Sequence, residues 1–191
     1  MLLVFSLALV AMCARATVVV PPAFDSLVLQ ADFVVRAVVK SVTAEWRRDG
    51  PHRHIITKVE VEVSEVIKGA PPSPLVLILL GGRIGQDELV VEGAPKFAVG
   101  DEAILFVRGN GRQFIPLVAI MYGVFPIAHD KLSGQDFVLR SDGHPLTSVS
   151  EVVTPMGSPA AKLGARTLTA AEFAAQIRIS SQQKSPTAHA N

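Results

Sequence analysis

The feature that most restricts the fold of this chain is the alternation of apolar and polar residues in 55–69, which read IITKVEVEVSEVIKG. Its side chains fall on two opposite faces of an extended chain, with Val59, Val61 and Val63 on one and Glu60, Glu62 and Ser64 on the other. A period of two is typical of a β-strand. Because one face is apolar and the other charged, we expect a half-buried antiparallel strand.

Further short apolar segments along the chain also predict strands. They are separated by turn signals in which glycine accepts a positive φ. The segments are 33–42, 75–80 and 103–107, and the turns are Asp49-Gly50, Gly100-Asp101 and Asp142-Gly143. Short strands at regular spacing predict an all-β domain, a barrel or sandwich, over residues 17–145.

Helices are expected only at the two ends of this domain. A short helical turn precedes the first strand, and Asp25 or Ser26 can cap it. Residues 146–166 lack periodicity and predict a linker, and 167–179 then predict a helix docked on the barrel. Thr169 and Glu172 have capping-box spacing at the start of that helix. Residues 180–191 are polar and predict a disordered tail.

The first residues predict export. Leu2 to Met12 form an apolar run, and Ala14-Arg15-Ala16 is a cleavage signal, so 1–16 predict a signal peptide cut after Ala16. A lipid anchor on Cys13 is less favoured, because the residue before it is a bulky methionine. The expected location is secreted or periplasmic, and the mature chain, without cysteine, must fold by burying its own core.

The charge balance argues against nucleic acid and membrane partners. Without Arg15, the 18 basic residues become 17, equal to the 17 acidic ones. No global field attracts the chain to a polyanion or to an anionic lipid surface. Aromatic residues make up only 6% of the chain, too few for extensive base stacking. We therefore expect a soluble protein whose partner is another extracytoplasmic protein.

The middle of the chain resembles the netrin-like domains, the OB-like barrels that include tissue inhibitors of metalloproteinases. The matching segments are ADFVVRAVVKSV, TKVEVEVSEVIKG, LVLILLGG and FAVGDEAILFV, within residues 23–127. The resemblance implies a small antiparallel barrel entered by a helix. Inhibitors of that family bind zinc through an N-terminal cysteine. Here the expected mature end is Thr17, so that mechanism is not implied for this chain.

Three loops are candidates for binding. The tip 108–112, RGNGR, could hold an anion with Arg108, Asn110 and Arg112, although an Asn-Gly hairpin turn explains the same residues. Arg83 lies in a similar glycine-rich segment, 81–85, which could equally be a plain turn or bulge. Trp46 stands with two arginines at a hairpin end and could contact a partner. The apolar segment 114–127 is either a closing hairpin or an exposed partner surface.

The sequence predicts neither catalytic residues nor a cofactor. His52 and His54 could be half of a metal site, but no third ligand follows at a suitable spacing, so we expect no metal. There is no nucleophile motif. The function that we expect is a non-enzymatic binding or regulatory domain acting on a protein outside the cytoplasm. The alternatives are a hydrolase without a recognisable motif and a structural component of the cell envelope.

Overall fold

A computed structural model describes residues 21–155, 158 and 166–183. The elements are short except for two strands and the last helix. In chain order they are α1 (Phe24–Gln30), β1 (Phe33–Asp49), β2 (His52–Lys68), β3 (Leu75–Leu80), β4 (Gly82–Ile84), β5 (Asp87–Leu89), β6 (Glu102–Val107), the 3-10 helix η1 (Ile120–Gly123), β7 (Val124–His129), β8 (Asp136–Val138), the 3-10 helix η2 (Val149–Val153) and α2 (Ala170–Gln183).

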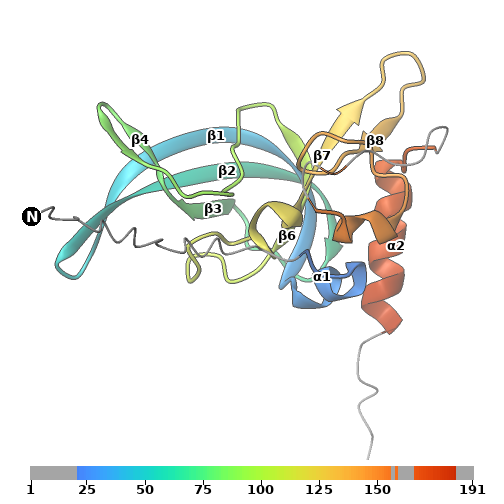
Figure 1. The fold of residues 1–191 in the computed structure, drawn as a ribbon, viewed down its shortest axis with the longest axis horizontal. Coiled ribbons are helices and arrows are strands. Elements are labelled where there is room, and N and C mark those ends of the chain that lie inside the picture. Colours follow the sequence, from blue (N-terminus) through green and yellow to red (C-terminus); the bar gives the residue numbers. More distant parts are fainter. Residues whose placement is uncertain (1–20, 156–157, 159–165, 184–191) are drawn as a thin grey trace, which may run out of the picture.

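The all-β barrel that the sequence predicts is confirmed only in part: the described chain is mostly antiparallel β, but its sheet is not closed into a barrel. Six strands form an antiparallel sheet in the order β3-β2-β1-β6-β7-β8, and β4 and β5 form a separate two-stranded ribbon. In the described part of the chain, β3 and β8 are the edges of the sheet and do not pair with each other. The helices gather at one end of the molecule and the β4–β5 ribbon lies towards the other (Figure 1).

The β1–β2 hairpin is the longest feature of the fold. Each strand has 17 residues, and the pairing runs to Asp49 opposite His52. The sequence predicts a strand ending near Val42, but the polar residues beyond it continue the ladder. β6 pairs with β1 over residues 33–38 alone. The end of the hairpin therefore projects past β6 and carries its polar side chains into solvent.

Two apolar clusters lie on opposite faces of the sheet. The helix-side cluster includes Val34, Ile104 and Phe106, with side chains from both helices. The loop-side cluster includes Val35 and Leu105 with side chains from β2, β3 and the segment 115–124. Adjacent residues of β1 and β6 point to opposite faces, as a pleated strand requires. β6 and the part of β1 that pairs with it are thus covered on both faces.

Helix α1 is held at its C-terminal end by the Lys68-Gly69 turn. The Lys68 ammonium donates hydrogen bonds to the carbonyl oxygens of Val28 and Ala31, both 2.6 Å long. These are carbonyls that the end of a helix leaves unpaired. Burial lowers the pKa of Lys68. The predicted cap at the other end is wrong: the N-cap is Ala23, which makes no side-chain cap hydrogen bond.

The capping box of α2 is confirmed. The Thr169 backbone N–H donates to the Glu172 carboxylate at 2.9 Å, and the Glu172 N–H donates to the Thr169 hydroxyl at 3.2 Å. The helix begins at Ala170 and ends at Gln183, later at both ends than predicted. Its Ser180, expected in a disordered tail, is buried and donates to Asp25 Oδ1 at 2.8 Å.

The start of the predicted linker packs on the helix side. Leu146 is fully buried in the helix-side cluster, and Val152 of η2 is 5% exposed. The predicted signal peptide 1–16 with Cys13, the predicted mature terminus Thr17, the linker residues 156–157 and 159–165, and the tail residues 184–191 lie outside the described residues. Among the described residues, no helix has the length and apolar character needed to cross a membrane.

Candidate functional site

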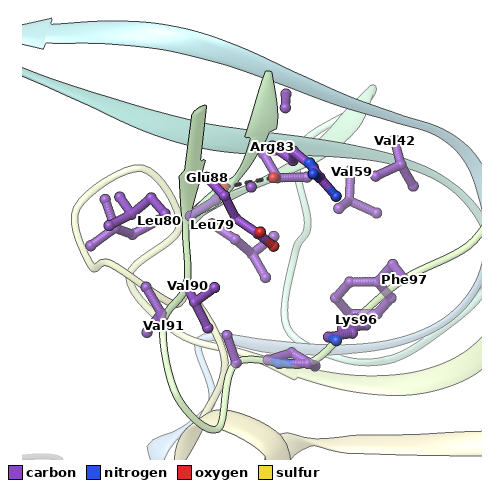
Figure 2. Close-up of a pocket in the computed structure, with 17 residues that line it drawn as sticks. Val42, Val59, Leu79, Leu80, Arg83, Glu88, Val90, Val91, Lys96 and Phe97 are labelled. Atoms are coloured by element: carbon purple, nitrogen blue, oxygen red, sulfur yellow. Dashed lines mark hydrogen bonds between the residues drawn. The ribbon is translucent and has the colours of Figure 1, made fainter. Parts of the chain in front are cut away.

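A groove of about 480 Å³ opens on the loop side of the sheet, between the β4–β5 ribbon and the segment 90–97. Its floor consists of core residues, including Val59 of β2 and Leu79 of β3. Figure 2 shows Arg83 and Glu88 extending from the ribbon, with Phe97 and Lys96 across the opening from Val90 and Val91. The site is therefore an apolar groove with charged side chains around its opening.

Two glycines place the ribbon over the groove. The Gly81 carbonyl accepts a hydrogen bond from the Thr57 hydroxyl at 2.7 Å, and the Gly81 N–H donates to the Ile55 carbonyl at 2.9 Å. Gly82 has a φ of 137°, and a Cβ atom there would lie 2.4 Å from the Thr57 Oγ1. Only glycine fits this close crossing. Segment 81–85 is therefore a turn followed by a short strand, and it presents Arg83 at the groove.

The walls of the groove expose apolar surface. Val90 is 73% exposed and Val42, on the opposite side, is 37% exposed. Arg83 and Lys96 are exposed, and neither forms an ion pair with another described residue. The groove can accept an aliphatic group on its floor while offering cations to an acidic group at its rim.

A second pocket, of about 210 Å³, lies on the other side of Leu80, whose side chain lines both sites. It forms where the tip of the β1–β2 hairpin meets the loop after β6. Its polar lining is mainly basic and comprises Arg47, Arg48, Asp49, His54, Arg112 and Gln113. We call it the basic pocket. Sequence reasoning proposed both of these loops, but could not show that they meet.

The 108–112 tip is not the two-residue hairpin turn that its Asn-Gly pair suggests. The chain instead runs on through 113–119 before β7 begins, and the tip is fastened to the edge of β3. The Asn110 amide donates to the Val76 carbonyl at 2.8 Å, and its oxygen accepts from the Ile78 N–H at 3.2 Å. The Gly109 N–H donates to Asp32 Oδ2 at 2.8 Å. Asn110 thus replaces a neighbouring strand at this edge.

In the tip, Asn110 therefore has a structural role, whereas Arg108 and Arg112 are exposed. We expect Asn110→Ala to lower the free energy of unfolding by about 1–2 kcal/mol, because two hydrogen bonds to the β3 backbone are lost. Arg108→Ala and Arg112→Ala should each stay within about 0.5 kcal/mol, as exposed residues usually do. Urea denaturation of the three variants measures the difference. Equal losses for all three would contradict the structural role of Asn110.

The other predicted site residues have distinct surroundings. Trp46 is 37% exposed and is covered by Arg53, whose guanidinium carbon lies 3.8 Å from the ring centroid. Trp46 lines neither the groove nor the basic pocket. Arg108 donates to Gln30 Oε1 at 2.9 Å and also lies outside both sites. Arg83 is at the groove, and Arg112 is at the basic pocket.

The segment 90–97 was missed by sequence reasoning as part of a site. It contains neither a motif nor clear periodicity, and its role depends on its position above β2 and β3. The one available signal is the apolar pair Val90-Val91, which follows β5 directly but belongs to no strand. The apolar segment 114–127 is mostly internal: Ile115, Leu117 and Val118 are buried, and only β7 forms a strand within it.

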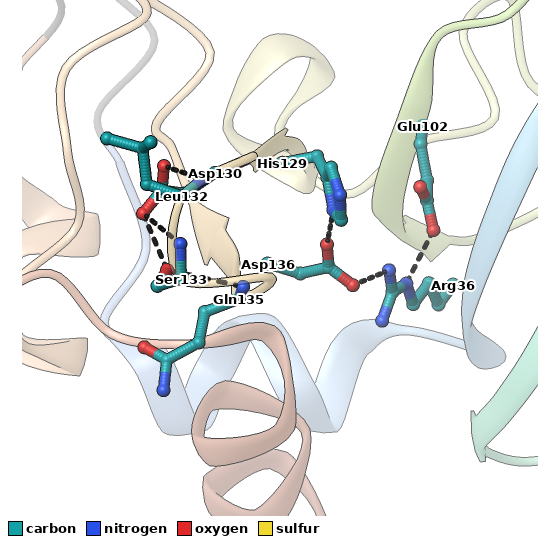
Figure 3. A network of polar contacts seen from close by, with 8 residues as sticks. All are labelled: Arg36, Glu102, His129, Asp130, Leu132, Ser133, Gln135 and Asp136. Atoms are coloured by element: carbon teal, nitrogen blue, oxygen red, sulfur yellow. Dashed lines mark hydrogen bonds and ion pairs between the residues drawn. The ribbon is translucent and has the colours of Figure 1, made fainter.

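A polar network joins β1, β6, β7 and β8 away from these pockets (Figure 3). Asp136 accepts from Arg36 Nη2 at 2.5 Å and contacts His129 Nδ1 at 2.6 Å, while Arg36 Nε donates to Glu102 at 2.6 Å. The hydrogen bonds from His129 and then from Arg36 lower the pKa of Asp136. Neither His129 nor Asp136 lines the groove or the basic pocket.

The lowered pKa of Asp136 predicts a pH-dependent contribution to stability. A carboxylate whose folded pKa lies below its unfolded value stabilises the fold above the unfolded pKa, near 4, and loses that effect as the pH falls through the folded pKa. We therefore expect Asp136→Asn to destabilise the protein at pH 7, and the difference from wild type to shrink below about pH 4. Denaturant unfolding at several pH values tests this. A difference that does not depend on pH would contradict it.

Within the described residues, no group of three or more histidine, cysteine and acidic side chains could hold a metal ion. His52 is exposed at the hairpin tip, opposite Asp49 in the strand register, and His54 lines the basic pocket. The site is therefore defined by an apolar groove and a basic pocket that share Leu80. Comparisons with protein-family models and with curated protein sequences found no match for this chain.

Proposed function

We propose that this chain is an exported, non-enzymatic domain that binds a protein partner outside the cytoplasm, and that the groove is its binding site. The observation that carries the proposal is the exposed apolar surface of the groove, where Val90 and Val42 border a floor of core side chains. Exposed apolar surface beside polar side chains is typical of interaction sites. The partner that fits it presents an aliphatic or aromatic segment.

The charges around the groove make the partner more specific. Arg83 and Lys96 lie at the opening together with a single acidic lining residue, Glu88. A partner segment with acidic residues next to its apolar ones complements this rim. Such charges affect the rate and selectivity of association more than its strength. The export predicted from residues 1–16 supports a partner in the same extracytoplasmic compartment.

The geometry favours binding over hydrolysis. The His129–Asp136 pair has the spacing of a histidine held by a carboxylate, but Asp136 is also bound to Arg36. A substrate would be enclosed in the groove, and neither residue lines it. A catalytic base needs to reach a bound substrate. The pair is better explained as a link between β8 and the central strands.

We also propose that the fold is related to the netrin-like domains. The supporting features are the order of α1 and the first strands, and the role of the Lys68-Gly69 turn in holding α1 against the sheet. The walls of the groove come mostly from residues 83–96, which lie between the segments that carry the resemblance. The zinc-chelating terminus of the inhibitors has no part in the proposal.

Two exposed valines allow a matched test of the groove. Val90 is 73% exposed and lines the groove, whereas Val99 is 69% exposed and does not line it. The chain from Thr17, with Val90→Asp and Val99→Asp as variants, would be used to capture proteins from the exported fraction of the source organism. We expect a stoichiometric partner that wild type and Val99→Asp retain and Val90→Asp loses.

Three other outcomes contradict the proposal in different ways. A partner that Val90→Asp retains would exclude the groove as the binding site. A partner lost with both variants would show a general effect of added negative charge. If wild type captures no protein, the function as a protein-binding domain is contradicted, and an assay for hydrolysis becomes the next experiment.

A further inference from the structure

We infer that the basic pocket binds carboxylate side chains, so that it recognises an acidic protein segment. Three arginines line it: Arg47 and Arg48 from the hairpin, and Arg112 from the loop after β6. Asp49 is the only acidic residue in the lining. At neutral pH the arginines therefore leave an excess of positive charge in a chain whose overall charge is nearly balanced.

The arginines are available for a ligand. Neither Arg47 nor Arg48 forms an ion pair with a carboxylate in the described residues. Arg112 is 81% exposed, and its Nη2 lies 3.9 Å from Asp32 Oδ2, at the limit of an ion pair. That same oxygen already accepts the Gly109 N–H. The guanidinium groups thus keep most of their donors free.

The backbone fixes the positions from which these side chains extend. Arg47 pairs with His54 across the β1–β2 ladder, so the two side chains extend from the same face. The loop opposite is held to the β3 edge by Asn110 and by the Leu80 N–H, which donates to the Phe114 carbonyl at 2.6 Å. Both sides of the pocket are therefore anchored to the sheet.

Carboxylate is the chemistry that this lining fits. A guanidinium presents a planar fork of donors that matches the two oxygens of a carboxylate. The pocket shares Leu80 with the apolar groove, while Ile56 and Ile78 here and Thr57 and Leu79 there extend from opposite faces of β2 and β3. The statement that the acidic segment belongs to the protein partner rests on the proposed function. The binding of carboxylates by the pocket does not depend on that function.

A peptide of six glutamates tests the pocket by itself, because it has no apolar side chain for the groove. We would measure its binding to the chain from Thr17 by fluorescence anisotropy at low ionic strength, with hexalysine as the control peptide. We expect saturable binding of hexaglutamate that weakens as salt is raised, since exposed charges are screened. Hexalysine should not bind at this site.

The variants compare two arginines of the pocket with two exposed cations outside it. Arg47→Ala/Arg112→Ala should weaken hexaglutamate binding by about fivefold or more, the range expected for two exposed charge pairs. Arg108→Ala/Lys131→Ala removes the same charge from residues that do not line the pocket and should change the affinity by less than about twofold.

Several results would overturn the inference. They are no saturable binding, equal weakening by both double variants, or displacement of the peptide by inorganic sulfate at the same charge concentration, which would identify a small oxyanion as the ligand. These results do not depend on whether the groove captures a partner. If hexaglutamate binds and no protein is captured, the carboxylate site stands and the proposed function fails.

Discussion

Replacing Phe173 with alanine is expected to lower the free energy of unfolding by about 3–5 kcal/mol, the range for a large aromatic residue removed from a packed core. The Phe173 side chain is fully buried. Its ring centroid lies 4.9 Å from that of Phe125, 5.8 Å from Phe24 and 6.2 Å from Phe106. It therefore joins α1 and α2 to β6 and β7.

The same substitution at an exposed phenylalanine is the matched control. Phe114 is 75% exposed, so Phe114→Ala should change the free energy of unfolding by less than about 0.5 kcal/mol. Chemical denaturation monitored by circular dichroism measures both variants. A loss below about 1 kcal/mol for Phe173→Ala would show that α2 does not depend on this contact, because the removal of a buried aromatic side chain usually costs more.

Gly69→Ala is the second substitution for which we expect a large loss, about 2–4 kcal/mol. Two penalties combine there. Gly69 has a φ of 74°, which costs an alanine about 1–2 kcal/mol. A Cβ atom would also lie 2.4 Å from the Asp32 carbonyl oxygen and 3.0 Å from Phe33 Cα. Because these are backbone atoms at the start of β1, relief requires the chain itself to move.

Gly50 allows the conformational penalty to be measured without the steric one. It has a similar φ, 58°, at the hairpin tip, but a Cβ atom there would meet nothing within 4 Å. Gly50→Ala should therefore show the conformational cost alone, about 1–2 kcal/mol. Thermal unfolding of both variants gives the difference. If Gly69→Ala were no worse than Gly50→Ala, the close approach of the Lys68-Gly69 turn to β1 would contribute nothing to stability.

The strands and caps that could be predicted from the sequence are those with a local cause. Alternation in 55–69 predicts β2 because one face of that strand meets the loop-side cluster. The capping box at Thr169 and Glu172 predicts the start of α2, since both partners lie within one helical turn. The Asp49-Gly50 signal predicts the β1–β2 hairpin, although the strands extend further towards it than the apolar pattern suggests.

The parts that could not be predicted depend on contacts between distant residues. Asn110 bonds to Val76 and Ile78, which lie more than 30 positions earlier, and nothing near Asn110 marks it as the cover of a strand edge. The groove is equally non-local, because its floor comes from β2 and β3 and its walls from β1 and from residues 83–97. Whether the sheet closes into a barrel depends on its overall curvature, which local patterns do not determine.

The arrangement of the groove has a consequence for how proteins with this frame can diverge. Val59 and Leu79 serve both as its floor and as core residues, so changes there affect folding. Arg83 and Val90 are exposed and lie outside both apolar clusters. Substitution of such surface residues carries little cost in stability. We expect relatives of this chain to keep the floor constant while their walls vary, so that specificity can evolve without rebuilding the fold.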